Sequence, residues 1–119
     1  MRHHRSGRTL GRKKGQRAAL LRSLTRSLIL NEGITTTLAR AKEMRPFVEK
    51  LVSASKKNTM VSRRNVASRL GGNSADVVKK LHEVIAPQFK NRPGGYTRVV
   101  RLPRTGKRVI ESARIEFVK

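Results

Sequence analysis

Cysteine and tryptophan are absent from this 119-residue chain, and other aromatic residues are rare: three phenylalanines and one tyrosine. Without cysteine the chain can form neither disulfides nor thiolate metal sites, which is common in cytosolic proteins. Hydrophobic residues make up 36% of the sequence, below the roughly 45–50% of ordinary globular domains. We therefore expect one small domain with a modest aliphatic core.

Acidic residues are also scarce: 7 Asp and Glu stand against 29 Lys and Arg, for a formal net charge of +22 at pH 7. Self-repulsion at that charge destabilises a compact state, so we expect an anionic partner that neutralises it. No apolar run approaches the ~20 residues that span a bilayer, and residues 1–17 lack the apolar stretch of a secretory signal. Nucleic acid is therefore the favoured partner, and no membrane span is expected.

The cations concentrate at the start of the chain, where residues 1–31 contain nine Lys or Arg and no acid. Within residues 1–15 the only aliphatic residue after the first position is Leu10, and glycines recur among the arginines. Such a segment cannot bury enough apolar surface to offset its ordering entropy. We predict a basic arm over residues 1–15, which orders on its partner, and a single domain over residues 16–119.

Hydrophobic periodicity predicts four helices and three strands beyond the arm. In chain order we expect a helix from about 16 to 31, a strand at 34–38, helices at 38–57 and 60–70, a helix between Ser74 and Pro87, and strands at 96–102 and 109–118. The order is helix, short strand, three helices and a C-terminal β-hairpin. It predicts an α+β fold of two layers, with the helices packed on one side of the sheet.

Pro46 falls inside the second predicted helix, so the helix should either kink there or begin close to Pro46, and we favour one kinked helix. Residues 103–108 are typical of a hairpin loop. The apolar face expected of the fourth helix consists of Val77, Val78, Leu81, Val84 and Ile85. The buried face expected of the last strand consists of Val109, Ala113, Ile115 and Phe117.

No constellation of residues typical of an enzyme is visible. Glu111 and Glu116 differ by an odd number of positions on the last predicted strand, so they should point to opposite faces. His82 has no second histidine nearby, and we expect it to be solvated or at the edge of the core. His3 and His4 could bind a metal as a pair, but in a basic arm we expect them to donate to phosphate. No phosphate-binding glycine motif is present either. From these observations together we predict no catalysis, no metal and no cofactor.

The basic residues favour binding to phosphate. The planar guanidinium fork suits bidentate phosphate contacts, and four arginines of the arm precede its first lysine. The alternatives are a solvated charged tail or a localisation signal. No helix-turn-helix, zinc finger or RNA-recognition aromatic motif is present, and few aromatics are available to stack on bases. We therefore expect recognition of a folded RNA by its phosphates and shape.

The stretch NRPGGYTRVVR, residues 91–101, holds the only tyrosine of the chain. Gly94 and Gly95 would let the backbone turn close to a phosphate. Tyr96 would stack on a base or sugar, or alternatively would cap the core of the sheet. Three surrounding arginines would clamp neighbouring phosphates: Arg92, Arg98 and Arg101. The full set predicted to bind RNA is Arg2, His3, His4, Arg5, Arg8, Arg12, Lys13, Lys14, Arg17, Arg22, Arg26, Arg40, Arg63, Arg64, Arg92, Gly94, Gly95, Tyr96, Arg98 and Arg101.

Four segments, in order over almost the whole chain, resemble the family of bacterial-type large-subunit ribosomal protein number seventeen: MRHHRSGRTLGRKKGQRAALLRSL, GITTTLARAKEMRPFVEKLV, SRR and NRPGGYTRVV. The most specific are TTTLARAKEMR and RPGGYTR. The resemblance implies an α+β structural component of the large ribosomal subunit in the cytoplasm. It also implies large-subunit ribosomal RNA near the polypeptide exit region and neighbouring ribosomal proteins as partners. Where the family typically has Arg-x-Gly-Asp, this chain has RTGK at 104–107, which makes the hairpin loop more basic.

Two other classes of protein remain as alternatives. A small DNA-compacting protein would also be basic and poor in aromatics, but it would bind duplex DNA as well as RNA. A membrane-active cationic protein is disfavoured because the basic arm lacks an apolar face.

Overall fold

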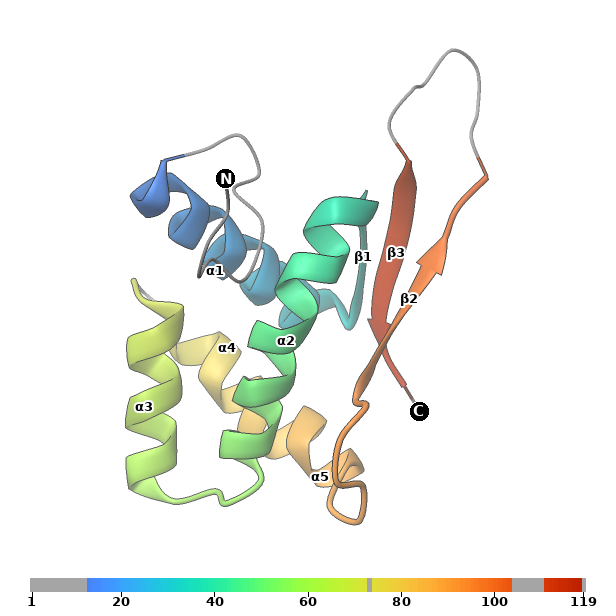
Figure 1. Cartoon of the computed structure of the whole chain (residues 1–119). Coiled ribbons are helices and arrows are strands. Elements are labelled where there is room, and N and C mark those ends of the chain that lie inside the picture. The colour runs from blue at the N-terminus through green and yellow to red at the C-terminus, as the bar shows by residue number, and fades with distance from the viewer. Residues whose placement is uncertain (1–12, 73, 104–110, 119) are drawn as a thin grey trace, which may run out of the picture.

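The computed structural model describes residues 13–72, 74–103 and 111–118. Within them the elements are α1 (Lys14–Asn31), β1 (Gly33–Thr37), α2 (Leu38–Ser55), α3 (Met60–Leu70), α4 (Ala75–Lys80), the π-helical turn η1 (Leu81–Ile85), α5 (Ala86–Gln88), β2 (Thr97–Arg101) and β3 (Ser112–Phe117). α4, η1 and α5 follow one another without a break and correspond to the fourth expected helix. The α+β order is thus confirmed, and the helices lie on one side of the sheet (Figure 1).

The three strands form one antiparallel sheet in the order β1-β3-β2, with the last strand in the centre. Ile115 lies between Ile34 of β1 and Val99 of β2 in the register. Ala113, Ile115 and Phe117 are buried, which confirms the alternation expected for β3. Val109 and residues 104–108 of the expected hairpin loop lie outside the described residues.

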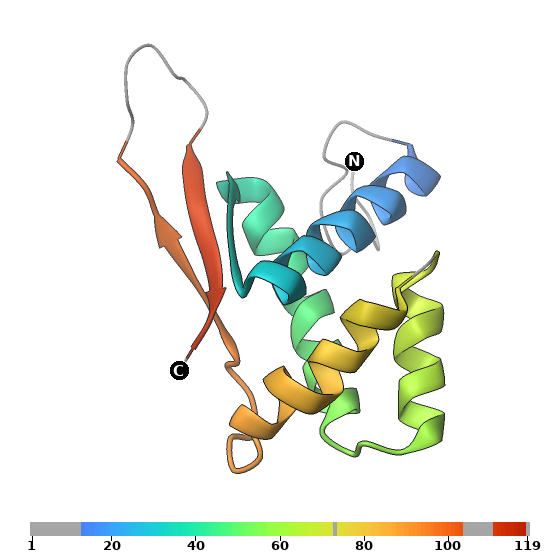
Figure 2. The same ribbon diagram turned by 180° about the vertical axis from the view of Figure 1, so that it is seen from behind.

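α2 lies at the centre of the fold, between the sheet and the other helices (Figures 1 and 2). Met44, Val48, Leu51 and Val52 of α2 have no exposed surface. Removing such side chains from water stabilises a fold by roughly 1.5–3 kcal/mol each. The helix continues through Pro46, which is exposed, so the carbonyl that lacks its usual N–H donor can be hydrated.

The ends of α1 and α3 follow local rules. Asn31 is the last residue of α1, and Glu32 adopts a left-handed φ of 63° and donates its N–H to the carbonyl of Leu28. α3 begins with a reciprocal capping box between Thr59 and Ser62, in which both N–H to Oγ distances are 3.1 Å. The helix stop expected after residue 31 is confirmed.

The prediction of which residues form the buried face of the fourth expected helix is partly wrong. Val84 is 45% exposed, whereas His82 is only 2% exposed. The reason is η1: its hydrogen bonds run from i to i+5, so the turn is wider than an α-helical turn and buried positions recur every four residues. The two buried rows are Val77, Leu81, Ile85 and Phe89, and Val78, His82 and Ala86.

The end of that helix also differs from expectation. Pro87 was expected to stop the helix, but α5 continues to Gln88. A proline ring clashes with the carbonyl four residues earlier in a regular α-helix. The residue four positions before Pro87 is Glu83, which lies within η1. The wide turn of η1 leaves more room there than a regular α-helical turn, which is a reason why one more residue can follow Pro87.

Candidate nucleic-acid interface

Two arginines that the sequence assigned to RNA hold α1 against the end of α3. The guanidinium of Arg26 donates to the carbonyl of Leu70, the last residue of α3, at 2.7 Å. The Arg22 side chain lies beside Gly71, with its Cδ 3.5 Å from where a Cβ would be. A cation at a helix C-terminus is stabilising because it complements the helix dipole. Both arginines are half-buried and do not lie on a free face of α1.

Lys80 is a third cation that lies at a helix C-terminus, in this case that of α1. Its ammonium donates to the carbonyl of Leu30 at 2.6 Å and lies 3.5 Å from the Glu32 carboxylate. The cations of this chain therefore fall into two groups: some stabilise the fold, and others remain free to bind a partner.

The face of the sheet that none of the described helices covers contains the clearest cluster of exposed arginines. Arg98 on β2 and Arg114 on β3 each lie near the Glu116 carboxylate, at 3.9 Å and 3.7 Å, and both side chains are about half exposed. One carboxylate shared by two guanidinium groups leaves a net positive charge. Exposed ion pairs are weak, so a phosphate can replace Glu116 at either arginine.

Sequence reasoning missed Arg114, although the signal was present. It alternates with Ala113 and Ile115 on β3, so it must point away from the core. Arg98 and Arg101 differ by three positions and lie opposite Glu116 and Ala113 respectively, so they point to opposite faces of the sheet. The clamp of neighbouring phosphates by Arg92, Arg98 and Arg101 stays a prediction, and in this fold Arg98 and Arg101 would have to reach those phosphates from opposite faces of the sheet.

Tyr96 belongs to the core, as the alternative reading expected. It is 1% exposed, and its ring centroid lies 5.1 Å from that of Phe89. Its hydroxyl lies 3.1 Å from Oγ of Ser53 and accepts a hydrogen bond from Lys56 at 3.3 Å. The predicted stacking of Tyr96 on a base is wrong because neither face of the ring is accessible. Gly95, with a φ of 64°, supplies the left-handed turn that leads the chain into β2.

The remaining candidates separate by exposure. Those exposed to solvent are Lys13, Lys14, Arg64, Arg92, Arg98 and Arg101. Those half-buried are Arg17, Arg22, Arg26, Arg40 and Arg63. The arm residues Arg2, His3, His4, Arg5, Arg8 and Arg12 lie outside the described residues. Exposed cations that the sequence analysis did not single out are Lys42, Arg45, Lys50, Lys57, Arg69, Lys79, Lys90 and Arg114.

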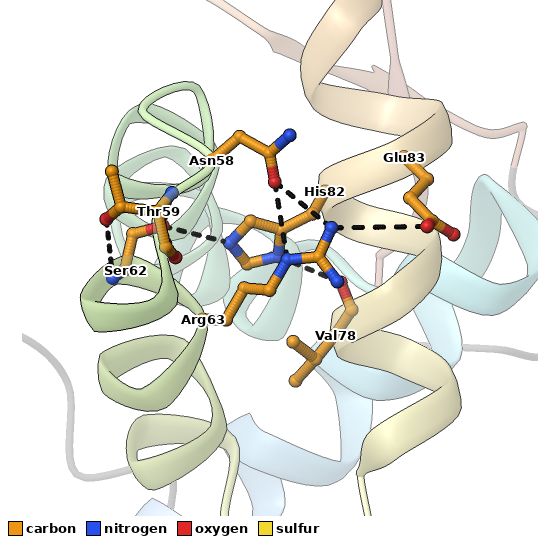
Figure 3. A network of polar contacts seen from close by, with 7 residues as sticks. All are labelled: Asn58, Thr59, Ser62, Arg63, Val78, His82 and Glu83. Carbon is orange, nitrogen blue, oxygen red and sulfur yellow. Dashed lines mark hydrogen bonds and ion pairs between the residues drawn. The ribbon is translucent and has the colours of Figure 1, made fainter.

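His82 lies inside the fold, where it joins η1 to the start of α3 (Figure 3). Its Nδ1 is 2.9 Å from the carbonyl of Val78, and its Nε2 is 3.3 Å from Oγ of Ser62. Because the carbonyl can only accept, Nδ1 carries a proton.

Among the described residues no group of three or more His, Cys, Asp or Glu could hold a metal ion, and no described helix is long and apolar enough to cross a membrane.

Comparison with known proteins gives a consistent result. The family model for "Ribosomal protein L17" matches residues 20–118. A relative from Sulfurihydrogenibium sp. is 50% identical over 122 residues, covering 100% of this chain and 98% of its own. Relatives from Thermomicrobium roseum and Hydrogenobaculum sp. are each 46% identical, over 118 and 120 residues, with at least 99% of both chains covered. All three are named "Large ribosomal subunit protein bL17".

Proposed function

This chain belongs to the ribosomal protein L17 family, and from that membership we propose that it is a structural constituent of the large ribosomal subunit. It binds and stabilises folded large-subunit ribosomal RNA beside neighbouring ribosomal proteins, and it catalyses no reaction. The observation that carries this proposal is the end-to-end match to relatives named for the large subunit. The net charge of +22 supports it, because a polyanion is needed to neutralise that charge.

Within this function the basic arm and the folded domain have separate roles. The arm, residues 1–15, lies along the RNA, and the domain, residues 16–119, docks on it through exposed cations. Two described surfaces of the domain support docking: the outer side of α3 with Arg64, and the open sheet face with Arg98 and Arg114. Lys13 and Lys14, which are exposed at the start of α1, belong to the arm.

The test is fractionation of a cell lysate on a density gradient at moderate and at high salt, with detection of this chain across the fractions. We expect it to migrate with the large subunit and to resist moderate salt. Migration as free protein, or with chromosomal DNA while large subunits remain complete, contradicts the proposal. The second result would favour a DNA-compacting protein.

A purified component system separates RNA from DNA directly. The dissociation constants for a large-subunit ribosomal RNA transcript and for duplex DNA of similar length are measured over a range of salt concentrations. The two affinities can be compared only at the same salt concentration, since counterion release makes both strongly salt-dependent. We expect tighter binding to the folded RNA at every salt concentration, and equal affinities would contradict recognition of an RNA fold.

A further inference from the structure

A hollow of about 250 Å³ lies where the end of α2 meets η1 and α5. Its lining includes Lys56, Asn58, His82 and Lys90, and none of the described residues that line it is acidic. The nearby carbonyls at the end of α2 are already occupied: those of Val52 and Ser55 accept the backbone N–H groups of Lys56 and Asn58, both at 3.1 Å. The hollow therefore presents donors and positive charge, which suits an anion.

Asn58 is fixed so that its amide donors are free. The guanidinium of Arg63 donates to Oδ1 of Asn58 from two nitrogens, at 3.3 Å and 3.1 Å. Arginine has no acceptor, so it must face the amide oxygen, and the NH₂ group is turned the other way (Figure 3). Within the described chain that NH₂ group donates to no protein acceptor. The left-handed φ of 47° holds Asn58 at the tip of the turn between α2 and α3.

The two lysines add charge on either side. Lys56 is held in place because it donates to the carbonyl of Arg92 at 2.6 Å and to the Tyr96 hydroxyl at 3.3 Å. An ammonium has three N–H groups, so one is left for a ligand. Lys90 follows α5, is exposed, and lines the hollow from the opposite element.

We propose that this hollow binds one backbone phosphate of the RNA, through Lys56, Asn58 and Lys90. This proposal rests on the proposed function. It adds three residues, Lys56, Asn58 and Lys90, that the sequence did not assign to RNA binding. A second, shallower hollow of about 780 Å³ adjoins the first, since Pro87 and Lys90 line both. The amides of Gln88 and Asn91 line it, together with Pro93. Amides and apolar rings suit an unpaired nucleoside attached to that phosphate, whereas a free phosphate ion would need only the first hollow.

The test compares three variants of the full chain that each lower the net charge by one. Asn58→Asp keeps the oxygen acceptor for Arg63 but replaces the amide donors with a carboxylate that repels phosphate. Lys90→Gln removes one ammonium from the rim. Lys57→Gln is the matched control, because Lys57 is exposed and lies next to Asn58 in sequence but does not line the hollow.

Affinity for a large-subunit ribosomal RNA transcript is measured at several salt concentrations. We expect Asn58→Asp and Lys90→Gln each to weaken binding about tenfold, the usual scale for a lost charge-assisted hydrogen bond, and Lys57→Gln to weaken it about twofold or less. The first two should also flatten the slope of log affinity against log salt by about 0.7–0.9, as one lost phosphate contact does. Ethylation interference should reveal one backbone phosphate whose modification weakens the wild type but not Asn58→Asp.

Other outcomes overturn the proposal. If Asn58→Asp and Lys90→Gln bind RNA as well as Lys57→Gln does, no RNA phosphate occupies the hollow, although the wild type still binds RNA and the proposed function stands. If the wild type itself fails to bind, the proposed function is wrong. If inorganic phosphate shifts the NMR signals of the Asn58 amide while the variants bind RNA normally, the site takes a free anion. A thermal melt of each variant checks that it is folded. If Asn58→Asp is unfolded, the RNA affinity of Lys90→Gln, a change at an exposed residue, tests the proposal instead.

Discussion

Individual cations of this protein differ in what they stabilise, although their chemistry is the same. Arg26 and Lys80 are each bound to the carbonyl end of a helix distant in sequence, at 2.7 Å and 2.6 Å. Arg64 is exposed on α3, and among the described residues the one hydrogen-bond partner of its guanidinium is the sulfur of Met60, at 3.5 Å. Arg26 and Lys80 therefore stabilise the fold whether or not RNA is present, whereas Arg64 makes no comparable contact with another helix.

Replacing Arg26 and Arg64 by methionine should therefore separate stability from binding. Arg26→Met removes a hydrogen bond from a charged donor and should lower the free energy of unfolding by about 1.5–3 kcal/mol. Arg64→Met should change it by less than about 0.5 kcal/mol, as is usual for exposed positions, but should weaken RNA binding. Urea denaturation without RNA and a binding titration measure the two effects. Equal stability of the two variants would show that the contact between Arg26 and Leu70 contributes nothing.

Tyr96 is a second position where the residue type alone is ambiguous. Tyr96→Ala should lower the free energy of unfolding by about 3–5 kcal/mol, because a large cavity opens beside Phe89. Tyr96→Phe should cost only about 0.5–1.5 kcal/mol, since it loses the hydroxyl contacts with Ser53 and Lys56 but keeps the ring. Both are measured by denaturation without RNA. If Tyr96→Ala is as stable as the wild type but binds RNA more weakly, Tyr96 contacts RNA and is not a core residue.

At the scale of elements, local periodicity predicted nearly every helix and strand, because amphipathic spacing and helix-end residues are local signals. It failed at Val84 and His82, where the wide turn of η1 changes the spacing of buried positions. It also could not assign Arg26 to the end of α3, since that contact joins residues 44 apart. Composition identifies a basic surface, but only tertiary packing decides which cations remain on it.

The junction between α3 and η1 gives a prediction at this scale. Ser62→Ala removes half of the capping box with Thr59 and leaves Nε2 of His82 buried without a partner. We expect a loss of about 1–3 kcal/mol in the free energy of unfolding. Ser68→Ala is the matched control on the exposed side of α3, and it should be neutral or slightly stabilising because alanine favours helix. If the two variants are equally stable, the polar contacts of Figure 3 do not hold α3 against η1.

At the scale of the whole molecule, positive charge reaches opposite ends of the fold. The start of α1, with Lys13 and Lys14, lies at one end, and the turn between α2 and α3, beside the proposed phosphate site, lies at the other (Figures 1 and 2). Both lie on the side of the molecule along which α3 runs (Figures 1 and 2). An RNA that contacts both ends must therefore extend along α3, or two RNA segments must each contact one end.

The same charge predicts that salt has opposite effects on the free protein and on its complex. The folded chain measures 46 × 31 × 27 Å, so at 0.01 M salt, where the Debye length is about 30 Å, the charges repel one another across most of the molecule. At 0.15 M the Debye length is about 8 Å and only near neighbours interact. The melting temperature of the free protein should rise over this range, while its affinity for RNA falls because counterion release is less favourable.

Lys50→Glu provides the control for that salt effect. Lys50 is exposed on α2, and the change lowers the net charge from +22 to +20 without touching the core. It should raise the melting temperature at 0.01 M salt and make it less dependent on salt, since less repulsion remains to be screened. Thermal melts of both proteins across the salt series measure this. A wild-type melting temperature that falls as salt is added would mean that the surface ion pairs, such as Glu116 with Arg98 and Arg114, stabilise the fold more than the net charge destabilises it.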